Sequence, residues 1–193
     1  MTLEIFLILY FSYLLGSIPS GVIFSKLFSL GDLRNIGSGN IGATNVFRSG
    51  NYFAAILTLL LDLFKAYLAI SICYIINSNL IILSASIILL GHIFPIWLTN
   101  LRGGKGFASF LGITFAINSF LVFIVCLIWI LIFLKTKMSS LATLISAHFS
   151  SLYSIIFFEL ETTVLFLILN IIIIFSHQEN IKRIVKGTEN KVL

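Results

Sequence analysis

The sequence predicts an all-α integral membrane protein, and three observations lead to this class. Of the 193 residues, 59% are hydrophobic and only 10% are charged, and the mean hydropathy is +1.12. Apolar runs, each near the ~20 residues that a helix needs to cross a bilayer, occupy most of the chain. These runs leave no room for a separate soluble domain, so residues 1–193 are expected to form one polytopic membrane domain.

Seven membrane segments are predicted, at about residues 3–28, 53–76, 80–98, 107–117, 120–134, 141–158 and 162–176. The first contains Pro19, which removes a backbone donor and should kink the helix, with Ser17 or Ser20 bonding the freed carbonyl groups. A removable signal peptide is not expected, because no Lys or Arg precedes Lys26 and no small-residue cleavage site follows.

The number of segments depends on residues 107–134, which as one continuous helix would measure about 42 Å, long for a ~30 Å bilayer core. A turn at Asn118 and Ser119 instead places 11 of the 12 Lys and Arg on one side, with Lys65 the exception. Cationic loops face the cytoplasm, so the N-terminus is expected outside and the C-terminus in the cytoplasm. The segment 107–117 is then too short to cross alone. The glycine-rich loop before it should dip into the membrane beside a polar cavity open to the cytoplasm.

The first polar motif, residues 38–48, places small, hydrogen-bonding and cationic residues between two apolar segments. Its Gly37-x-Gly39-x-x-Gly42 pattern matches the dinucleotide-binding fingerprint, and Asp62 follows 20 residues later. The flanks are membrane helices and not a βαβ unit, so a dinucleotide site is excluded.

The same motif is suited to an anion. Glycines allow backbone N–H groups to converge, and Thr44 and Asn45 just before the second helix can cap it and direct its dipole at a phosphate. A tight loop of turn-forming residues without a ligand is an equal alternative.

The second motif is Arg102-Gly103-Gly104-Lys105-Gly106. It resembles half of a Walker A loop, but Thr99 stands where the first Gly is required and Gly106 where Ser or Thr is required, so an ATP site is not expected. A Gly-flanked lysine before a short helix remains suited to phosphate. The alternative is a cytoplasmic anchor, for which a lone lysine would suffice.

The third motif follows the last segment, at residues 176–183. The imidazole of His177 can act as general base or phosphate donor, and Asn180 lies about one turn further on the same face. A polar helix end at the interface is the alternative. His92 and His148 are interpreted as structural, with His92, which caps the third helix beside Phe94, the stronger candidate for a role.

Other polar residues support these motifs. Asp62 and Lys65 are three apart and should pair along the helix, supporting the cavity in preference to direct catalysis. Ser139 and Ser140 add donors on the cytoplasmic face. No metal, cofactor or Ser-His-Asp site is expected, so catalysis would orient an activated acyl or phosphoryl compound beside an acceptor.

The remaining features exclude other classes. Cys73 and Cys126 fall within apolar runs and are expected to fill space. The net charge of +5 lies in short loops and the tail, which indicates cytoplasmic anchoring and no nucleic-acid partner.

Taken together, the motifs resemble those of the bacterial acyl phosphate:glycerol-3-phosphate acyltransferase family. The resemblance runs from about residue 16 to 189 and rests on four stretches: 16–21, 37–48, 91–106 and 177–189. Arg102, Ser109 and Met138 are mild departures from the family pattern. Ser176 and Gln178 replace basic residues that often flank the histidine.

The resemblance implies a seven-helix enzyme of the bacterial cytoplasmic (inner) membrane, functional as a monomer and without a cofactor. It would transfer a fatty acyl group from acyl phosphate to the sn-1 hydroxyl of glycerol 3-phosphate, giving lysophosphatidic acid and inorganic phosphate. This is the first acylation step of phospholipid synthesis.

The resemblance also assigns roles to residues. His177, Asn180 and Ser38 would serve catalysis, with Ser38 also orienting phosphate together with Arg34 or Arg48. The remaining substrate-binding residues would be Gly39, Asn40, Thr44, Asn45, Gly103, Gly104, Lys105, Gly106 and Ser140. Glu179 would be structural.

The main rival prediction is a transporter or channel for organic phosphates, since carriers also bind anions among short broken helices. A carrier should need polar groups that continue to the outer face, where this sequence has little beyond asparagines and two glutamates. A non-catalytic membrane partner is a third possibility, for which the polar motifs would be superfluous.

Overall fold

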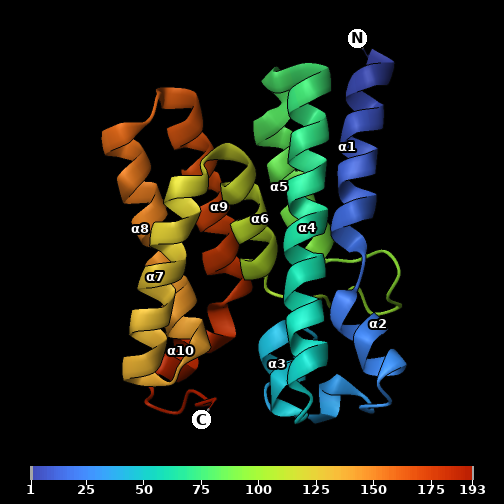
Figure 1. Cartoon of the computed structure of the whole chain (residues 1–193), viewed down its shortest axis with the longest axis vertical. Helices are drawn as coiled ribbons and strands as arrows, with labels where there is room; N and C mark the ends of the chain where they lie inside the picture. Colours follow the sequence, from blue (N-terminus) through green and yellow to red (C-terminus); the bar gives the residue numbers. More distant parts are fainter. Residues whose placement is uncertain (1, 193) are drawn as a thin grey trace.

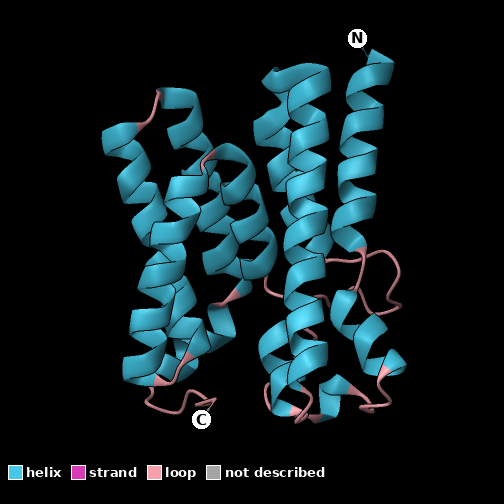
Figure 2. Cartoon of the chain, viewed as in Figure 1, coloured by secondary structure: helices cyan, strands magenta, loops and turns pink. Residues whose placement is uncertain are grey.

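A computed structural model describes residues 2–192, in which all the regular secondary structure is helical and no strand occurs, with loops joining the helices (Figures 1 and 2). The longer helices are α1 (Thr2–Ser17), α4 (Tyr52–Asn77), α5 (Ile81–Ile93), α6 (Phe107–Ile117), α7 (Ser119–Thr136), α8 (Ser139–Phe157) and α9 (Leu160–Ser176). The shorter ones are α2 (Ser20–Leu27), η1 (Leu33–Asn35), α3 (Ala43–Arg48), η2 (Ser78–Leu80) and α10 (Gln178–Val185).

The longer helices run along a common axis in two groups (Figure 1). One group contains α1, α4 and α5, and the other contains α7, α8 and α9, with α6 packed between α4 and α7. The N-terminus lies at one end of the axis and the C-terminus at the other. The short helices α2, α3 and α10 gather at the C-terminal end, so the three polar motifs are drawn toward that half of the molecule.

Four stretches among the described residues are long and apolar enough to cross a membrane: Leu3–Leu27, Tyr52–Ile93, Ser119–Thr136 and Ser139–Phe157. The bent pair formed by α9 and α10 adds a fifth if it is counted as one span. Tyr52–Ile93 contains both α4 and α5, which fold back on each other (Figure 1). Large apolar side chains cover the outside of the bundle, as with Ile75 on α4 and Ile156 on α8. Such a surface suits lipid better than water.

Pro19 breaks the first apolar segment into α1 and α2, as the sequence predicts. The carbonyl group of Ile18 at this break accepts a hydrogen bond of 2.7 Å from the ammonium group of Lys65. Neither expected serine bonds a freed carbonyl group: Ser17 Oγ is without a partner, and Ser20 Oγ donates to the carboxylate of Asp62. A lysine on a neighbouring helix therefore takes this role, because its long side chain reaches across the contact between α1 and α4.

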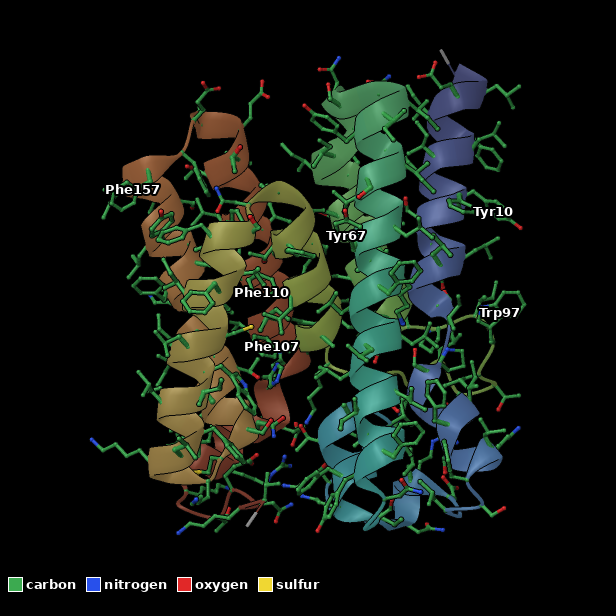
Figure 3. All side chains as sticks on the ribbon, in the orientation of Figure 1. Tyr10, Tyr67, Trp97, Phe107, Phe110 and Phe157 are labelled. Carbon is green, nitrogen blue, oxygen red and sulfur yellow. The ribbon has the colours of Figure 1, made fainter. Side chains whose placement is uncertain are left out.

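Helices α1 and α5 approach closely because glycines face backbone at their contact. A Cβ added to Gly16 would lie 2.3 Å from the carbonyl oxygen of Ile88, and one added to Gly91 would lie 2.7 Å from that of Tyr13. Side chains pack the space between the two groups. Phe107 and Phe110 of α6 point toward the α7–α9 group, whereas Tyr10, Trp97 and Phe157 lie on the outside (Figure 3).

The segment predicted at 80–98 is shorter as a helix, because α5 ends at Ile93, two residues before Pro95. Residues 94–106 then form an irregular loop about midway along the long axis (Figure 2). It ends at Gly106, whose φ of 88° is in the left-handed region and precedes α6. The expected turn is present at Asn118, whose side chain accepts a hydrogen bond of 2.7 Å from the N–H of Leu121 and caps α7.

Candidate active site

A cavity of about 530 Å³ lies where the three polar motifs meet. One part is polar and is lined by Ser38, Asn40, Thr44, Asn45, Arg48, Lys105, Gly106, Ser140, His177 and Asn180. These are ten of the predicted site residues, and they come from positions up to 142 residues apart. Four other predicted residues, Arg34, Gly39, Gly103 and Gly104, lie outside this lining.

The first motif is held in shape by Asn45. Its Oδ1 accepts a hydrogen bond of 3.1 Å from the N–H of Ser38, and its Nδ2 donates one of 2.8 Å to the carbonyl of Leu33. Gly37 has a φ of 52° and sits against the Asn45 side chain, where a Cβ would lie 2.6 Å from Oδ1. Asn45 is buried and occupied by these contacts, so it shapes the loop that presents Ser38.

Arg34 and Arg48 lie in different surroundings. Arg48, at the end of α3, lines the cavity, and its Nη2 donates to the carbonyl of Asn190 at 3.3 Å. Arg34 is exposed, and its Nη2 donates to Asn100 Oδ1 at 3.0 Å. Arg34 therefore ties the segment before the first motif to the segment before the second, while Arg48 supplies charge to the cavity.

The prediction that Thr44 and Asn45 cap the second membrane helix is wrong. Both lie inside α3, a separate helix of six residues. Helix α4 begins only at Tyr52, and it is capped by Asn51, whose Oδ1 accepts a hydrogen bond of 2.9 Å from the N–H of Ala54. Thr44 Oγ1 lies 3.1 Å from Ser139 Oγ and joins α3 to α8.

The glycines of the second motif are required by close packing. Gly103 N–H donates to the carbonyl of Ile93 at 2.8 Å, and Gly104 N–H donates to that of His92 at 3.0 Å. A Cβ on Gly103 would lie 2.0 Å from the carbonyl oxygen of His92, and one on Gly104 would lie 2.0 Å from His92 Nε2. The loop is thus pressed against the end of α5, and this contact directs Lys105 into the cavity.

The ammonium group of Lys105 donates to Asn180 Oδ1, which joins the second motif to the third. Burial lowers the pKa of Lys105 to about 8; the positive charges of Arg183 and Arg48 act in the same direction, and the carboxylate of Glu189 opposes them. A cationic group in a partly buried site interacts strongly with an anion, because the local dielectric constant is low.

Glu189 also lines the polar part of the cavity, a position that the sequence did not predict. Its Oε1 accepts hydrogen bonds from Asn180 Nδ2 at 2.6 Å and from Ser140 Oγ at 2.7 Å, and its Oε2 pairs with Arg183 Nε at 2.8 Å. Burial raises the pKa of this carboxyl group, but the hydrogen bonds from Ser140, Asn180 and Arg183 outweigh it and the net shift is downward. Gly187-Thr188-Glu189 in the resemblance was the available signal, but only the folded tail brings the carboxylate to Ser140.

The imidazole of His177 is buried and lines the cavity. Its Nδ1 lies 2.8 Å from the carbonyl oxygen of Ile173, so the proton on this ring is assigned to Nδ1. Nε2 is then the proton-accepting atom in the neutral ring, as a general base requires. Glu179, by contrast, is exposed and pairs with Lys182 at 2.8 Å, outside the lining of the cavity.

The second part of the cavity is apolar and extends between α4, α6 and α7. Its lining consists of aliphatic and aromatic side chains: Ala55, Ile56, Leu59, Phe107, Leu111, Cys126, Trp129, Ile130 and Phe133. Trp129 is oriented by its Nε1–H, which donates to Thr143 Oγ1 at 3.2 Å, and by stacking with Phe133. One cavity therefore joins a cationic polar end to a hydrocarbon-like groove.

Comparison with known proteins agrees with this geometry. A family described as glycerol-3-phosphate acyltransferase matches residues 6–187. A curated glycerol-3-phosphate acyltransferase of Pelagibacter ubique is 43% identical over 180 residues, which cover 93% of each chain. The chain therefore belongs to the glycerol-3-phosphate acyltransferase family.

Solved structures of the family share the fold. PlsY, an integral membrane glycerol 3-phosphate acyltransferase crystallised in a glycerol 3-phosphate form, aligns with a TM-score of 0.91 and 31% identity, covering 97% of this chain and 94% of that one. A lysophosphatidic acid form of the same protein aligns with a TM-score of 0.87 and 29% identity over the same shares. With the apolar helices described above, this similarity identifies a multi-pass membrane protein.

The structure also shows the surroundings of other residues that the sequence analysis considered. Asp62 and Lys65 form the expected pair, at 2.8 Å. His148 Nδ1 lies 3.2 Å from Asn170 Nδ2 and joins α8 to α9 outside the cavity. Cys73 and Cys126 are both free; Cys73 is buried, whereas Cys126 lines the apolar groove.

Proposed function

We propose that this protein transfers a fatty acyl group from acyl phosphate to the sn-1 hydroxyl of glycerol 3-phosphate, giving lysophosphatidic acid and inorganic phosphate. The observation that carries the proposal is the single cavity with a cationic polar end and an apolar groove. One end matches the phosphate groups of both substrates, and the other matches a fatty acyl chain. The glycerol 3-phosphate form of the similar PlsY structure supports this choice of acceptor.

The proposed mechanism relies on orientation and charge. Arg48 and Lys105 bind phosphate together with Ser38 and Ser140, and the apolar groove holds the acyl chain. The acceptor oxygen attacks the acyl carbonyl carbon, the bond from that carbon to the phosphate oxygen breaks, and inorganic phosphate leaves with the bonding electrons. Acyl phosphate is a mixed anhydride with a good leaving group, so holding the two substrates together supplies much of the acceleration.

The proton of the attacking hydroxyl goes to His177 Nε2 or to the phosphate of glycerol 3-phosphate, whose second pKa is near neutral. Our hypothesis is that His177 orients the acceptor and assists this transfer. Asn180 positions Lys105 through the hydrogen bond between them, so it acts on the phosphate through the lysine.

The proposed setting is the bacterial cytoplasmic membrane. Seven membrane segments would place the N-terminus outside, and the C-terminus and the polar end of the cavity in the cytoplasm. Single cysteines at Ser78 and Lys137, in a background without Cys73 and Cys126, test this arrangement with a membrane-impermeant thiol reagent on intact cells. Labelling is expected at Ser78 and not at Lys137, and the reverse pattern would overturn the orientation.

Activity is tested with purified protein, acyl phosphate and labelled glycerol 3-phosphate. The expected product is labelled lysophosphatidic acid, with release of one inorganic phosphate. Failure of a folded sample to form it would refute the proposed reaction. Uptake of glycerol 3-phosphate into protein-containing vesicles without acyl phosphate would instead support the transporter alternative. Activity of the monomeric peak from size-exclusion chromatography tests the expected monomer.

A further inference from the structure

A cluster of buried polar groups lies at the wall of the cavity, where α2, α4, α5 and α6 meet, and two of its residues, Asp62 and His92, line the cavity. Asp62 Oδ1 accepts hydrogen bonds from Ser20 Oγ at 2.7 Å and from Lys65 Nζ at 2.8 Å, and it lies 3.5 Å from His92 Nδ1. The Asp62 side chain is only 4% exposed. A buried carboxylate is tolerated when several donors satisfy it, and replacing such a pair by apolar groups is often neutral or stabilising. Stability alone therefore does not account for this cluster.

On one side, the cluster supports the second motif. His92 Nδ1 also lies 3.2 Å from Ser109 Oγ in the first turn of α6. The ring is thereby held with Nε2 against Gly104, where an added Cβ would lie 2.0 Å away, and the His92 carbonyl accepts the N–H of Gly104. Both the ring and the main chain of His92 thus form the surface on which the residue before Lys105 rests.

On the other side, the cluster supports the first motif. Ser20 begins α2, and Gly21, which follows it, is packed so closely on the first motif that a Cβ would lie 1.8 Å from the carbonyl oxygen of Ile41. Lys65 holds the carbonyl of Ile18 in the same turn. A continuous series of contacts therefore runs from Ile41 through Ser20, Asp62 and His92 to Gly104.

We propose that Asp62 and His92 are positioning residues that hold the two phosphate-binding loops at the correct separation. The inference rests on the proposed function, in which Arg48 from one loop and Lys105 from the other bind phosphate. A displacement of about 1 Å in such groups can lower the rate by ~100-fold. The cluster sets this distance because it contacts both loops through rigid, buried groups.

The first test compares two double variants that remove the same ion pair. Asp62→Leu/Lys65→Met removes the acceptor for Ser20 and His92, whereas Asp62→Asn/Lys65→Met retains an oxygen at that position. We expect kcat/KM for glycerol 3-phosphate to fall by about 10-fold or more in the first, since the loops lose their common support. The conservative variant should recover most of this loss.

Melting temperature in detergent is measured for both variants and for Ser12→Ala/Ser84→Ala. The control pair removes another buried hydrogen bond, of 2.7 Å, between α1 and α5, two helical turns or more from the loops. It is expected to leave kcat/KM unchanged, whatever its effect on the melting temperature. Equal losses of activity in the two Asp62 variants would overturn the proposal, because only the ion pair would then matter.

A second test uses the contact between His92 and Gly104 and remains decisive if an Asp62 variant does not fold. Gly104→Ala alone should raise the KM for glycerol 3-phosphate by about 10-fold or more, because the new methyl group meets the imidazole and displaces the loop. In a His92→Ala background, the same substitution should cost much less, since the ring is gone. Additive losses would contradict the proposal. An inactive wild-type protein in the same assay would refute the proposed function itself, so the two failures are distinguishable.

Discussion

Lys105, in the loop before α6, donates a hydrogen bond to Asn180 Oδ1 in α10, although 75 residues separate them in the sequence. The same asparagine donates through Nδ2 to Glu189, which also accepts from Ser140. The amide of Asn180 can satisfy both partners in one orientation only, because one end accepts and the other donates. The loop, α10, the tail and α8 are therefore joined at the cavity through the side chains of Asn180 and Glu189.

Arg48 of the first motif and Arg34, which precedes that motif, should differ in their effect on activity. Arg48→Ala is expected to lower kcat/KM for glycerol 3-phosphate by roughly 10- to 100-fold, since it removes a charged hydrogen-bond donor from the cavity. Arg34→Ala should have a much smaller effect, because Arg34 is exposed and bonds Asn100. Steady-state kinetics of both variants measure this, and a larger loss at Arg34 would contradict the assignment.

Activity should fall as the pH rises through the pKa of Lys105. That pKa is about 8, so the lysine is cationic below this pH and loses its charge, and its attraction for phosphate, above it. The pH profile of kcat/KM for glycerol 3-phosphate reports groups of the free enzyme and is expected to decline above about pH 8.

The matched variant is Lys105→Arg, whose guanidinium keeps its charge over the same range. Its activity should be lower, because an arginine does not fit the contact with Asn180 in the same way, but the decline above pH 8 should disappear. An unchanged decline would assign the titration to another group or to the substrate.

His177→Ala should lower kcat more than it changes the KM for glycerol 3-phosphate. General base catalysis contributes typically about 100-fold or more, and a shared role with the substrate phosphate predicts a loss near the lower end, ~100-fold. Asn180→Ala should act mainly on KM, through Lys105. The control is His148→Ala, which removes an exposed imidazole outside the cavity and should retain wild-type kinetics. Wild-type rates in both His177→Ala and Asn180→Ala would remove the third motif from catalysis.

Chain-length preference should respond to the width of the apolar groove. Ile56 lines this groove and is 53% exposed, so Ile56→Trp can fill it without overpacking the core. We expect activity with long-chain acyl phosphates to fall more than activity with short-chain ones. Ile75→Trp makes the same change on the same helix at a position that is 81% exposed and outside the cavity, and should leave the preference unaltered. An equal loss with all chain lengths would contradict this use of the groove.

Local chemistry made much of the site predictable. Three local signals can be recognised over a few residues each: glycines before a lysine, an arginine after a glycine-rich loop, and a histidine after an apolar helix. The order and spacing of these signals indicate the family. The difference between Arg34 and Arg48 carries no such signal, since both follow turn residues in the same loop. Their separation depends on α3, which turns Arg48 inward while Arg34 reaches Asn100.

The sequence by itself determined the membrane class, the helix-breaking points at Pro19 and Asn118 and the residues of the three polar motifs, because these follow from hydropathy, backbone chemistry and charge along the chain. Only the tertiary structure decided that Lys65 bonds the carbonyl at Pro19, that Asn45 shapes its loop and that Glu189 joins Ser140 to Asn180. Each of these contacts either joins groups that are remote in the sequence or replaces the partner that the sequence would suggest by a different one. Partner choice among buried polar groups depends on where the helices meet, and so it cannot be read from local spacing.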